Sequence, residues 1–299
     1  MLVFNCSKAA ADFFITTKKG EVISPIEAAP HKTIAESIGS LASDPSKVLP
    51  DDIIQSDGLD VIQWHWLVHA IKVKRKNVLI VMDYHSRFSI TLSGLKKGDQ
   101  YAFLNMFEHH LNVHIHELMQ VVCDSSGDIQ KSLAQYNKAH DSCAFHQRGD
   151  RSVQSTLNDV VWHFKESSHT QGAVPEGVDL IGFDAFVNDL LRKHKTEKEY
   201  FYPRRKFLHA WLAEYGEMTK AQADKKIQQL KDQERAEHHM RYNTLPEPNA
   251  EPNVEPNAEQ NSKKNTAPSA ESLLAENTEQ THDLSNVVFI DAFKNKNKH

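Results

Sequence analysis

The pattern of apolar and polar positions is densest between Val61 and Gly94, where it predicts three consecutive strands. In the first strand, Trp64, Trp66, Val68 and Ala70 alternate with Leu67, Ile71 and Val73, so apolar side chains point to both faces of a sheet. The second strand, Val78–Met82, is apolar throughout, as expected of a strand that is buried on both faces. The third strand, Phe88–Leu92, alternates with serine and threonine and predicts one solvent-exposed face. A short charged link between the first two strands predicts an antiparallel meander with Val78–Met82 in the middle.

Apolar residues at helical spacing occur in the sequence on both sides of this meander. A short strand at residues 2–6 leads into a helix capped by Ser7, and apolar stripes predict helices over residues 99–120 and 129–140. A further helix begins near Arg151, with Asp150 or Ser152 as its cap. After a break at residues 172–177, the spacing predicts three more helices, the last starting with a capping box at Thr219 and Gln222.

These elements predict an α+β fold: an antiparallel β-meander packed with helices, followed by an all-helical extension and a disordered C-terminal tail. We place the α+β domain at residues 1–170 and the helical extension at 178–242. Residues 243–283 contain Glu-Pro-Asn repeats with too little apolar area to offset the entropy of ordering, which predicts a disordered linker. Residues 284–299 form an apolar-basic terminal motif, and its apolar part, 284–293, is either a docking motif for a partner protein or sheet edge or a chance hydrophobic cluster.

The composition of the chain indicates the cellular compartment in which we expect it. The chain has no apolar run of about 18 residues and no signal-peptide pattern, so we expect a cytoplasmic protein without a membrane partner. Three cysteines without CxxC spacing fit a reducing compartment and argue against a zinc ribbon. The net charge of -5 is concentrated in residues 244–283, which carry eight acidic and two basic side chains, so the remainder is close to neutral.

Three blocks carry a resemblance: MLVFNCSKAAADF, then QWHWLVHAIKVKRKNVLIVMDYHSRFSITLSGLK, then GDRSVQSTLND. Together they resemble a family of uncharacterised bacterial domains of unknown function, with a Trp-His strand, a basic hairpin and an Asp-Arg-Ser…Asn helix. The resemblance covers roughly residues 1–167. It implies an α+β domain and a bacterial source, and it implies no activity.

The residues that these blocks select define a candidate pocket: Trp64, His65, Asp83, Arg87, Asp150, Arg151, Ser152 and Asn158. If they converge at one edge of the sheet, the arginines and the helix N-terminus would bind an anion or a nucleotide. The alternative, which we favour, is structural, with Arg87 pairing Asp83 or Asp150 to tie the loop to the helix.

Two metal-site hypotheses are weaker. LIVMDYHSRFSITL resembles the Asp-bearing strand of transposase and integrase catalytic cores, but the first-strand carboxylate is missing and only Glu108 and Glu117 follow Asp83. His110, His114 and Glu117 share one helical face, which is a spacing suited to zinc. With 18 histidines in the chain, a solvated helix face explains this spacing better, so we expect no metal and no cofactor.

Residues 192–206 hold seven basic and two acidic side chains interleaved with aromatic rings, a pattern suited to phosphate contacts and base stacking. The candidate nucleic-acid-binding residues are Lys193, Lys195, Tyr200, Tyr202, Arg204, Arg205 and Lys206. The alternative is a solvated charged face. The sequence therefore favours a binding or regulatory protein, with nucleic acid or a protein as partner. The alternative is an enzyme that acts on a nucleotide or nucleic acid at the candidate pocket.

Overall fold

The computed structural model describes residues 1–30, 34, 53–56, 59–123, 125–193 and 199–243. The predicted terminal motif and, apart from Asn243, the predicted linker lie outside the described residues. Residues up to Gln233 form one compact unit with the sheet, and α8 (Lys220–Asn243) runs on from this unit into a second one. None of the helices in the described ranges is long and apolar enough to cross a membrane.

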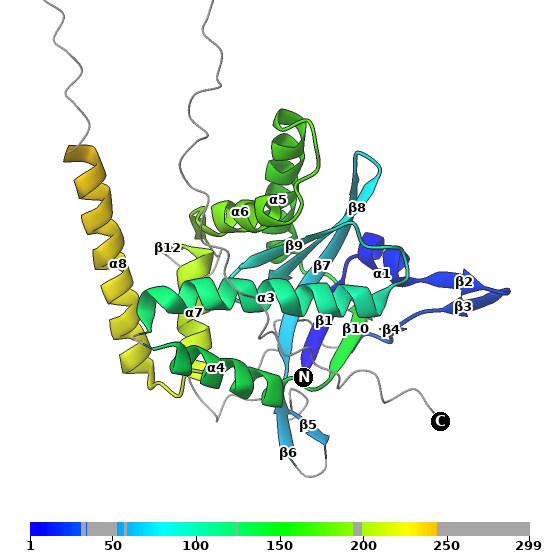
Figure 1. The fold of residues 1–299 in the computed structure, drawn as a ribbon. Helices are drawn as coiled ribbons and strands as arrows, with labels where there is room; N and C mark the ends of the chain where they lie inside the picture. The colour runs from blue at the N-terminus through cyan, green and yellow to red at the C-terminus, as the bar shows by residue number, and fades with distance from the viewer. Residues whose placement is uncertain (31–33, 35–52, 57–58, 124, 194–198, 244–299) are drawn as a thin grey trace, which may run out of the picture. The chain divides into compact units, whose positions relative to one another are not determined.

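A six-stranded mixed sheet with strand order β4-β10-β1-β7-β8-β9 organises the chain (Figure 1). The predicted meander is present: β7 (Trp64–Val73), β8 (Lys76–Asp83) and β9 (Ser89–Ser93) are antiparallel, with β8 in the middle. On the other side of β7, three strands run parallel to it. They are β1 (Leu2–Cys6), β10 (Cys143–Gln147) and the short β4 (Ile26–Glu27).

Three small two-stranded ribbons complete the strands. They are β2 (Thr16–Lys18) with β3 (Glu21–Ile23), β5 (Ile53–Ser56) with β6 (Leu59–Ile62), and β11 (Arg192–Lys193) with β12 (Tyr200–Phe201). The remaining helices are α1 (Lys8–Phe14), α3 (Gln100–Val122), α4 (Ser126–Ala139), α5 (Arg151–Thr170), α6 (Val178–Asn188) and α7 (Pro203–Glu214). The α+β class predicted from the sequence is confirmed.

One face of the sheet packs against α1, α3, α4, α7 and the start of α8. Phe4, Trp66 and Val81 are fully buried there against apolar side chains of these helices. The sequence predicted a separate helical extension after residue 178, but Trp211 of α7 and Ile227 of α8 belong to this same core. These helices therefore help to close the domain built around the sheet.

The opposite face packs against α5 and α6. Leu67, Ile80 and Met82 of the meander meet the apolar stripe of α5, which begins at Val153. Because β8 has apolar side chains on both faces, both of its faces are covered by helices, as its uninterrupted apolar sequence predicted.

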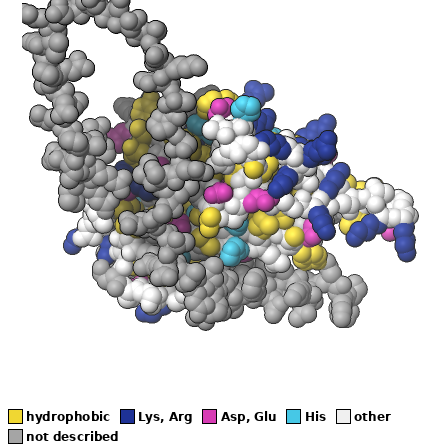
Figure 2. All heavy atoms as spheres, turned by 45° about the horizontal axis from the view of Figure 1, so that its top comes forward, with side chains coloured by type: hydrophobic (Ala, Val, Ile, Leu, Met, Phe, Trp, Pro, Cys, Tyr) yellow, Lys and Arg dark blue, Asp and Glu magenta, His cyan; other side chains and the backbone are white. Residues whose placement is uncertain are grey.

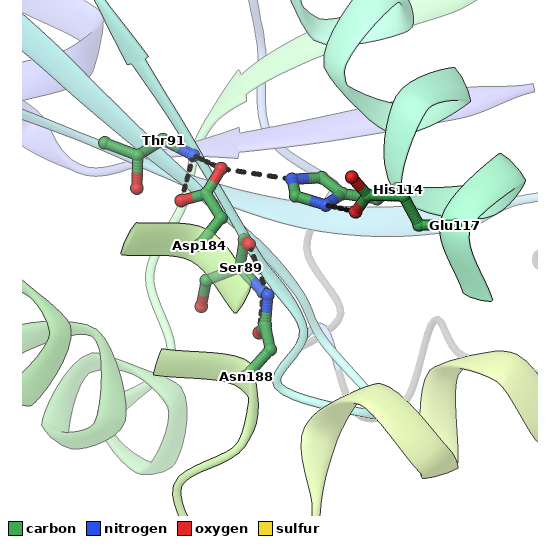
Figure 3. A network of polar contacts seen from close by, with 6 residues as sticks. All are labelled: Ser89, Thr91, His114, Glu117, Asp184 and Asn188. Atoms are coloured by element: carbon green, nitrogen blue, oxygen red, sulfur yellow. Dashed lines mark hydrogen bonds and ion pairs between the residues drawn. The ribbon is translucent and has the colours of Figure 1, made fainter. Parts of the chain in front are cut away.

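The prediction of a solvent-exposed face on the third strand is wrong, because α6 covers β9, the edge strand of the sheet (Figure 3). Asn188 accepts a hydrogen bond from the Ser89 backbone N–H at 2.7 Å and donates one to the Ser89 carbonyl at 2.8 Å. Asp184 accepts the Thr91 N–H at 3.0 Å. The helix thus supplies the partners that a further strand would otherwise provide.

The spacing of these two side chains explains the fit. Asp184 and Asn188 lie four residues apart on one helical face, roughly 6 Å along the axis. Ser89 and Thr91 lie two residues apart on an extended strand, roughly 6.6 Å. A helix can therefore satisfy two successive outward-facing backbone groups of a strand, and unpaired edges are a liability in soluble domains.

Asp184 also receives a charge from the other side of the sheet. His114 of α3 is buried, and its Nε2 donates to Asp184 Oδ2 at 3.3 Å (Figure 3). Burial opposes the charged imidazolium, but the carboxylates of Asp184 and Glu117 outweigh it and raise the pKa of His114 to about 9. A buried ion pair thus joins α3, α6 and the edge strand.

Breaking this junction should destabilise the fold strongly. Asp184→Ala leaves the His114 charge buried without its partner, and we expect a loss of about 3–5 kcal/mol in the free energy of unfolding. Asn188→Ala leaves two backbone groups of Ser89 unpaired, at about 1–3 kcal/mol for each group. Asp179→Ala, on an exposed position of α6, is the matched control and should change stability by less than about 1 kcal/mol. Urea denaturation measures all three, and equal effects of Asp184→Ala and Asp179→Ala would contradict the assignment.

The pKa of His114 predicts a pH dependence. A group whose pKa is higher in the folded protein stabilises it fully below the unfolded pKa of 6.5, and this contribution is lost as pH rises through about 9. The free energy of unfolding should therefore fall between pH 7 and about 9.5. His114→Gln should flatten this part of the profile, whereas His116→Gln, two residues along the same helix, should leave it unchanged.

Candidate functional site

The candidate pocket residues do not all converge, because the strand alternation sends them to opposite faces. Trp64 and Asp83 lie on the face of α3, where Trp64 Nε1 donates to Asp83 Oδ1 at 2.7 Å. The Trp64 ring stacks on Phe207 and Tyr215 within an aromatic cluster. His65, the next residue, points to the face of α5. The Trp-His pair of the predicted pocket is therefore split by the sheet.

Asp83 closes a turn. Its Oδ2 accepts hydrogen bonds from the Ser86 backbone N–H at 2.6 Å and from the Ser86 hydroxyl at 2.5 Å. The carboxylates that a two-metal hypothesis would add have other partners: Glu108 accepts the Tyr136 hydroxyl, and Glu117 faces His114. Across the described ranges, no group of three or more His, Cys, Asp or Glu side chains is placed to hold a metal ion.

Arg87, Asp150 and Ser152 do converge, and Tyr84 joins them. The Arg87 guanidinium donates to the Tyr84 carbonyl and to Ser152 Oγ, the latter at 3.2 Å. The Tyr84 hydroxyl donates to Asp150 Oδ2 at 3.0 Å. These contacts tie the loop between β8 and β9 to the first turn of α5.

Asp150 is the cap of α5. Its Oδ1 accepts the Ser152 N–H at 2.8 Å and the Ser152 hydroxyl at 2.6 Å, and it also accepts the Val153 N–H. Burial would raise the pKa of Asp150, but these hydrogen bonds and the one from Tyr84 hold it below its usual value. The capping carboxylate already satisfies the N-terminal amides that an anion would use. Arg151 and Asn158 are exposed, and Asn158 Oδ1 accepts a hydrogen bond from the Gln154 side chain.

The prediction that His110, His114 and Glu117 form a solvated face of α3 is wrong for the two histidines. His110 and His114 are buried, and only Glu117 is exposed. His114 faces inward because its imidazolium pairs with Asp184, a partner more than 60 residues away that helical spacing could not indicate.

In residues 192–206, basic and aromatic side chains contact one another. Arg192 pairs with Asp159, and Arg204 Nε lies 2.5 Å from Asp189 Oδ1. Three further cations lie over aromatic rings of the same segment: Lys193 over Tyr200, Arg205 over Tyr202 and Lys206 over Phe201. Lys195 lies outside the described residues. Two of these cations are thus neutralised by carboxylates, and three more are held against rings of the same segment.

A second basic surface was missed in the sequence. Three turns carry exposed cations, and we call them together the basic loop surface: Lys18 and Lys19 of the β2–β3 turn, Lys72, Lys74 and Arg75 of the β7–β8 hairpin, and Lys96 and Lys97 before α3. Figure 2 shows Lys and Arg side chains gathered on this side of the molecule. In the sequence these residues occur as short groups that lie far apart.

Hydrogen bonds hold two of these turns together and tie the segment before α3 to the end of α1, which precedes β2. The Gly94 N–H donates to the Asn77 carbonyl at 3.1 Å, and the Asn77 side chain donates to the Leu95 carbonyl at 3.1 Å. The Gly98 N–H donates to the Phe13 carbonyl at 2.9 Å. Gly98 has φ of +80°, and a Cβ there would meet Thr16 Cγ2 at 1.9 Å, so the close approach requires glycine.

The arrangement around Arg87 predicts a stability effect. Arg87→Ala removes the hydrogen bond to Ser152 of α5 and the one to the Tyr84 carbonyl within the loop, and we expect a loss of about 1–3 kcal/mol in the free energy of unfolding. Arg151→Ala, in the same sequence motif but exposed, should stay within about 0.5 kcal/mol of the wild type. Urea denaturation distinguishes the two, and a neutral Arg87→Ala would show that this arginine does not hold the loop.

Comparison with known protein families gives a match. The family model described as a domain of unknown function, DUF6933, matches residues 39–206, more than half of the chain. The match begins and ends later than the 1–167 expected from the resemblance, so β1 and α1 lie outside it while α6 and the strands β11 and β12 lie inside. Searches of curated proteins and of solved structures returned no match. The chain therefore belongs to the DUF6933 family of domains of unknown function.

Proposed function

We propose that this protein binds nucleic acid through the basic loop surface. The observation that carries the proposal is the convergence of seven exposed lysine and arginine side chains from three turns. Within the described residues, the ion pair seen at this surface joins Lys76 and Glu176, and Lys76 directly follows Arg75 in the sequence. Several unpaired cations on one surface match the regularly spaced phosphates of a nucleic-acid backbone.

The shape of the hairpin supports this partner. Beyond the residues that pair with β9, the β7–β8 hairpin is two-stranded only from Lys72 to Asn77, and its turn carries Lys74 and Arg75 at the tip. The major groove of a duplex is wide enough to admit a two-stranded ribbon. The three turns would then contact phosphates on either side of the groove.

The backbone of the same turn gives a second argument. Lys74 and Arg75 both have positive φ, 45° and 68°, a conformation that asparagine and glycine adopt more easily than basic residues. Basic residues here give up some local stability, and strain of this kind often accompanies function. Their charge, rather than their turn preference, explains their presence.

Other functions receive less support. The segment at 192–206 remains a second candidate interface, but two of its three arginines, Arg192 and Arg204, pair with Asp159 and Asp189. An enzyme acting from the candidate pocket is less favoured, because Trp64 is buried in the aromatic cluster and Arg87 is held against Tyr84 and Ser152.

A salt series tests the proposal. Fluorescence anisotropy with a short labelled duplex should give an affinity that falls steeply with salt, because binding releases counterions. Lys74→Asn with Arg75→Gly removes two charges and supplies the turn sequence that this backbone prefers, so the fold should be preserved. This variant should reduce the slope of log K against log salt by roughly two units.

Arg204→Ala with Arg205→Ala is the matched control, with the same loss of charge at the other basic segment. An unchanged slope in this control supports the basic loop surface. A reduced slope here, with the hairpin variant unchanged, would move the interface to residues 192–206. No binding at low salt by the wild type, or binding to vesicles of anionic lipid in place of the duplex, would overturn the proposal.

A further inference from the structure

A second feature is independent of the basic loop surface. On the sheet face covered by α5, three polar side chains of adjacent strands lie close together: His65 of β7, Asn5 of β1 and His146 of β10. Asn5 lies directly opposite His146 in the register. The exposed fractions are 2% for His65, 0% for Asn5 and 8% for His146. We call these residues the His65 cluster.

The hydrogen bonds fix the tautomer of His65. The Asn5 amide nitrogen lies 3.2 Å from His65 Nδ1 and 3.2 Å from the Trp66 carbonyl. An amide nitrogen only donates, so His65 Nδ1 accepts and carries no proton. Burial, together with the charge of Arg148 and the nearby His146, lowers the pKa of His65 to about 3, so the ring is neutral. Its one proton therefore sits on Nε2.

The N–H group at His65 Nε2 has no acceptor among the residues that the structure describes. His65 Nε2 is fully buried and makes no hydrogen bond to the described part of the chain. Asn5 Oδ1 and His146 Nδ1 are likewise buried without a partner. Buried polar atoms are nearly always paired, so three adjacent exceptions point to a place that receives polar atoms from elsewhere.

The position in the fold agrees with this inference. Asn5 and His146 stand one residue before the carboxyl ends of the parallel strands β1 and β10. The helices that follow these strands, α1 and α5, pack on opposite faces of the sheet. In open α/β sheets, ligands bind where neighbouring connections diverge in this way.

A positive charge stands beside the cluster. Arg148 directly follows β10, and its backbone N–H donates to the Cys6 carbonyl, which holds it at this end of the sheet. Burial is the main cause of the lowered pKa of His65, and the charge of Arg148 contributes in the same direction. A buried N–H donor next to an arginine is complementary to an oxygen that carries negative charge.

We propose that the His65 cluster binds a small molecule through a phosphate or carboxylate group, whose oxygen accepts the hydrogen bond of His65 Nε2–H beside Arg148. Asn5 and His146 hold polar atoms of the same ligand. A buried water molecule is the competing occupant, and it would give no dependence on added anions.

The test uses the full chain and two probes, inorganic phosphate and succinate, each compared with sodium chloride at equal ionic strength. Thermal denaturation should show a rise in Tm with one of the probes, because binding to the folded state alone stabilises it. A rise with phosphate alone or succinate alone distinguishes the two oxyanions. No rise with either probe would overturn the proposal.

Variants localise the effect. His65→Phe and Arg148→Gln should each abolish most of the rise. Arg148→Gln, near the surface, serves as the test if His65→Phe does not fold. Arg151→Gln, which lies on the exposed side of α5, should keep the full rise. Lys74→Asn with Arg75→Gly should also keep it, and its loss there would mean that the anion binds only at the basic loop surface.

A spectroscopic measurement adds a direct readout. Long-range proton–nitrogen correlation of imidazole nitrogens should show His65 protonated at Nε2 and unprotonated at Nδ1 at neutral pH. Adding the stabilising anion should shift the His65 Nε2 resonance and leave that of His163 on α5 unchanged. The opposite tautomer, or no shift during a thermal stabilisation, would contradict the assignment.

Discussion

The structure depends on the apolar character of β8 on both of its faces. Val78 to Met82 are all fully buried, so helices have to cover the sheet on each side. One set of helices meets Leu79 and Val81, and another meets Val78, Ile80 and Met82. Burial of apolar surface contributes roughly 25 cal/mol per Å², so this two-sided burial favours folding. The helices after residue 178 pack on the sheet because they too cover its apolar faces.

Helices cover both faces of the sheet, but the backbone groups at the edge of the meander still need hydrogen-bond partners. β9 would expose a row of backbone donors and acceptors, and α6 satisfies them with Asp184 and Asn188 in place of another strand. Placing a carboxylate there requires a compensating charge, and His114 reaches it from α3. The polar junction is thus a consequence of ending an apolar sheet at a buried edge.

Local periodicity was enough to predict the meander, the long helices and the caps. The uninterrupted apolar run of β8, the capping carboxylate of Asp150 and the capping box at Thr219 and Gln222 are all short-range features, and each occurs in the structure. The failures share a different cause. Ser89 and Thr91 alternate as a half-exposed strand would, and only contacts about 90 residues along the chain reveal that α6 buries them.

The residues of the candidate pocket are divided between two faces of the sheet for a related physical reason. Adjacent residues of a strand face opposite sides, so Trp64 and His65 were never able to share a pocket, although they are neighbours in sequence. Conversely, Asn5, His65 and His146 lie far apart in the sequence and meet because β1, β7 and β10 pair in a parallel register that periodicity does not specify. Parallel pairing depends on long-range connections, so the sequence pattern around each strand carries no trace of its partner.

The difference between neighbours in sequence and neighbours in the fold also applies to charged residues. In the densest basic segment, residues 192–206, Arg192 and Arg204 pair with acidic side chains of α5 and of the end of α6. The three turns of the basic loop surface lie far apart in the sequence, and each adds only two or three cations to one side of the folded molecule. An electrostatic field is the sum over such gathered charges, and it decides where a polyanion is attracted. Where a polyanion is attracted therefore depends on how the fold arranges the charges in space, and not only on their density along the chain.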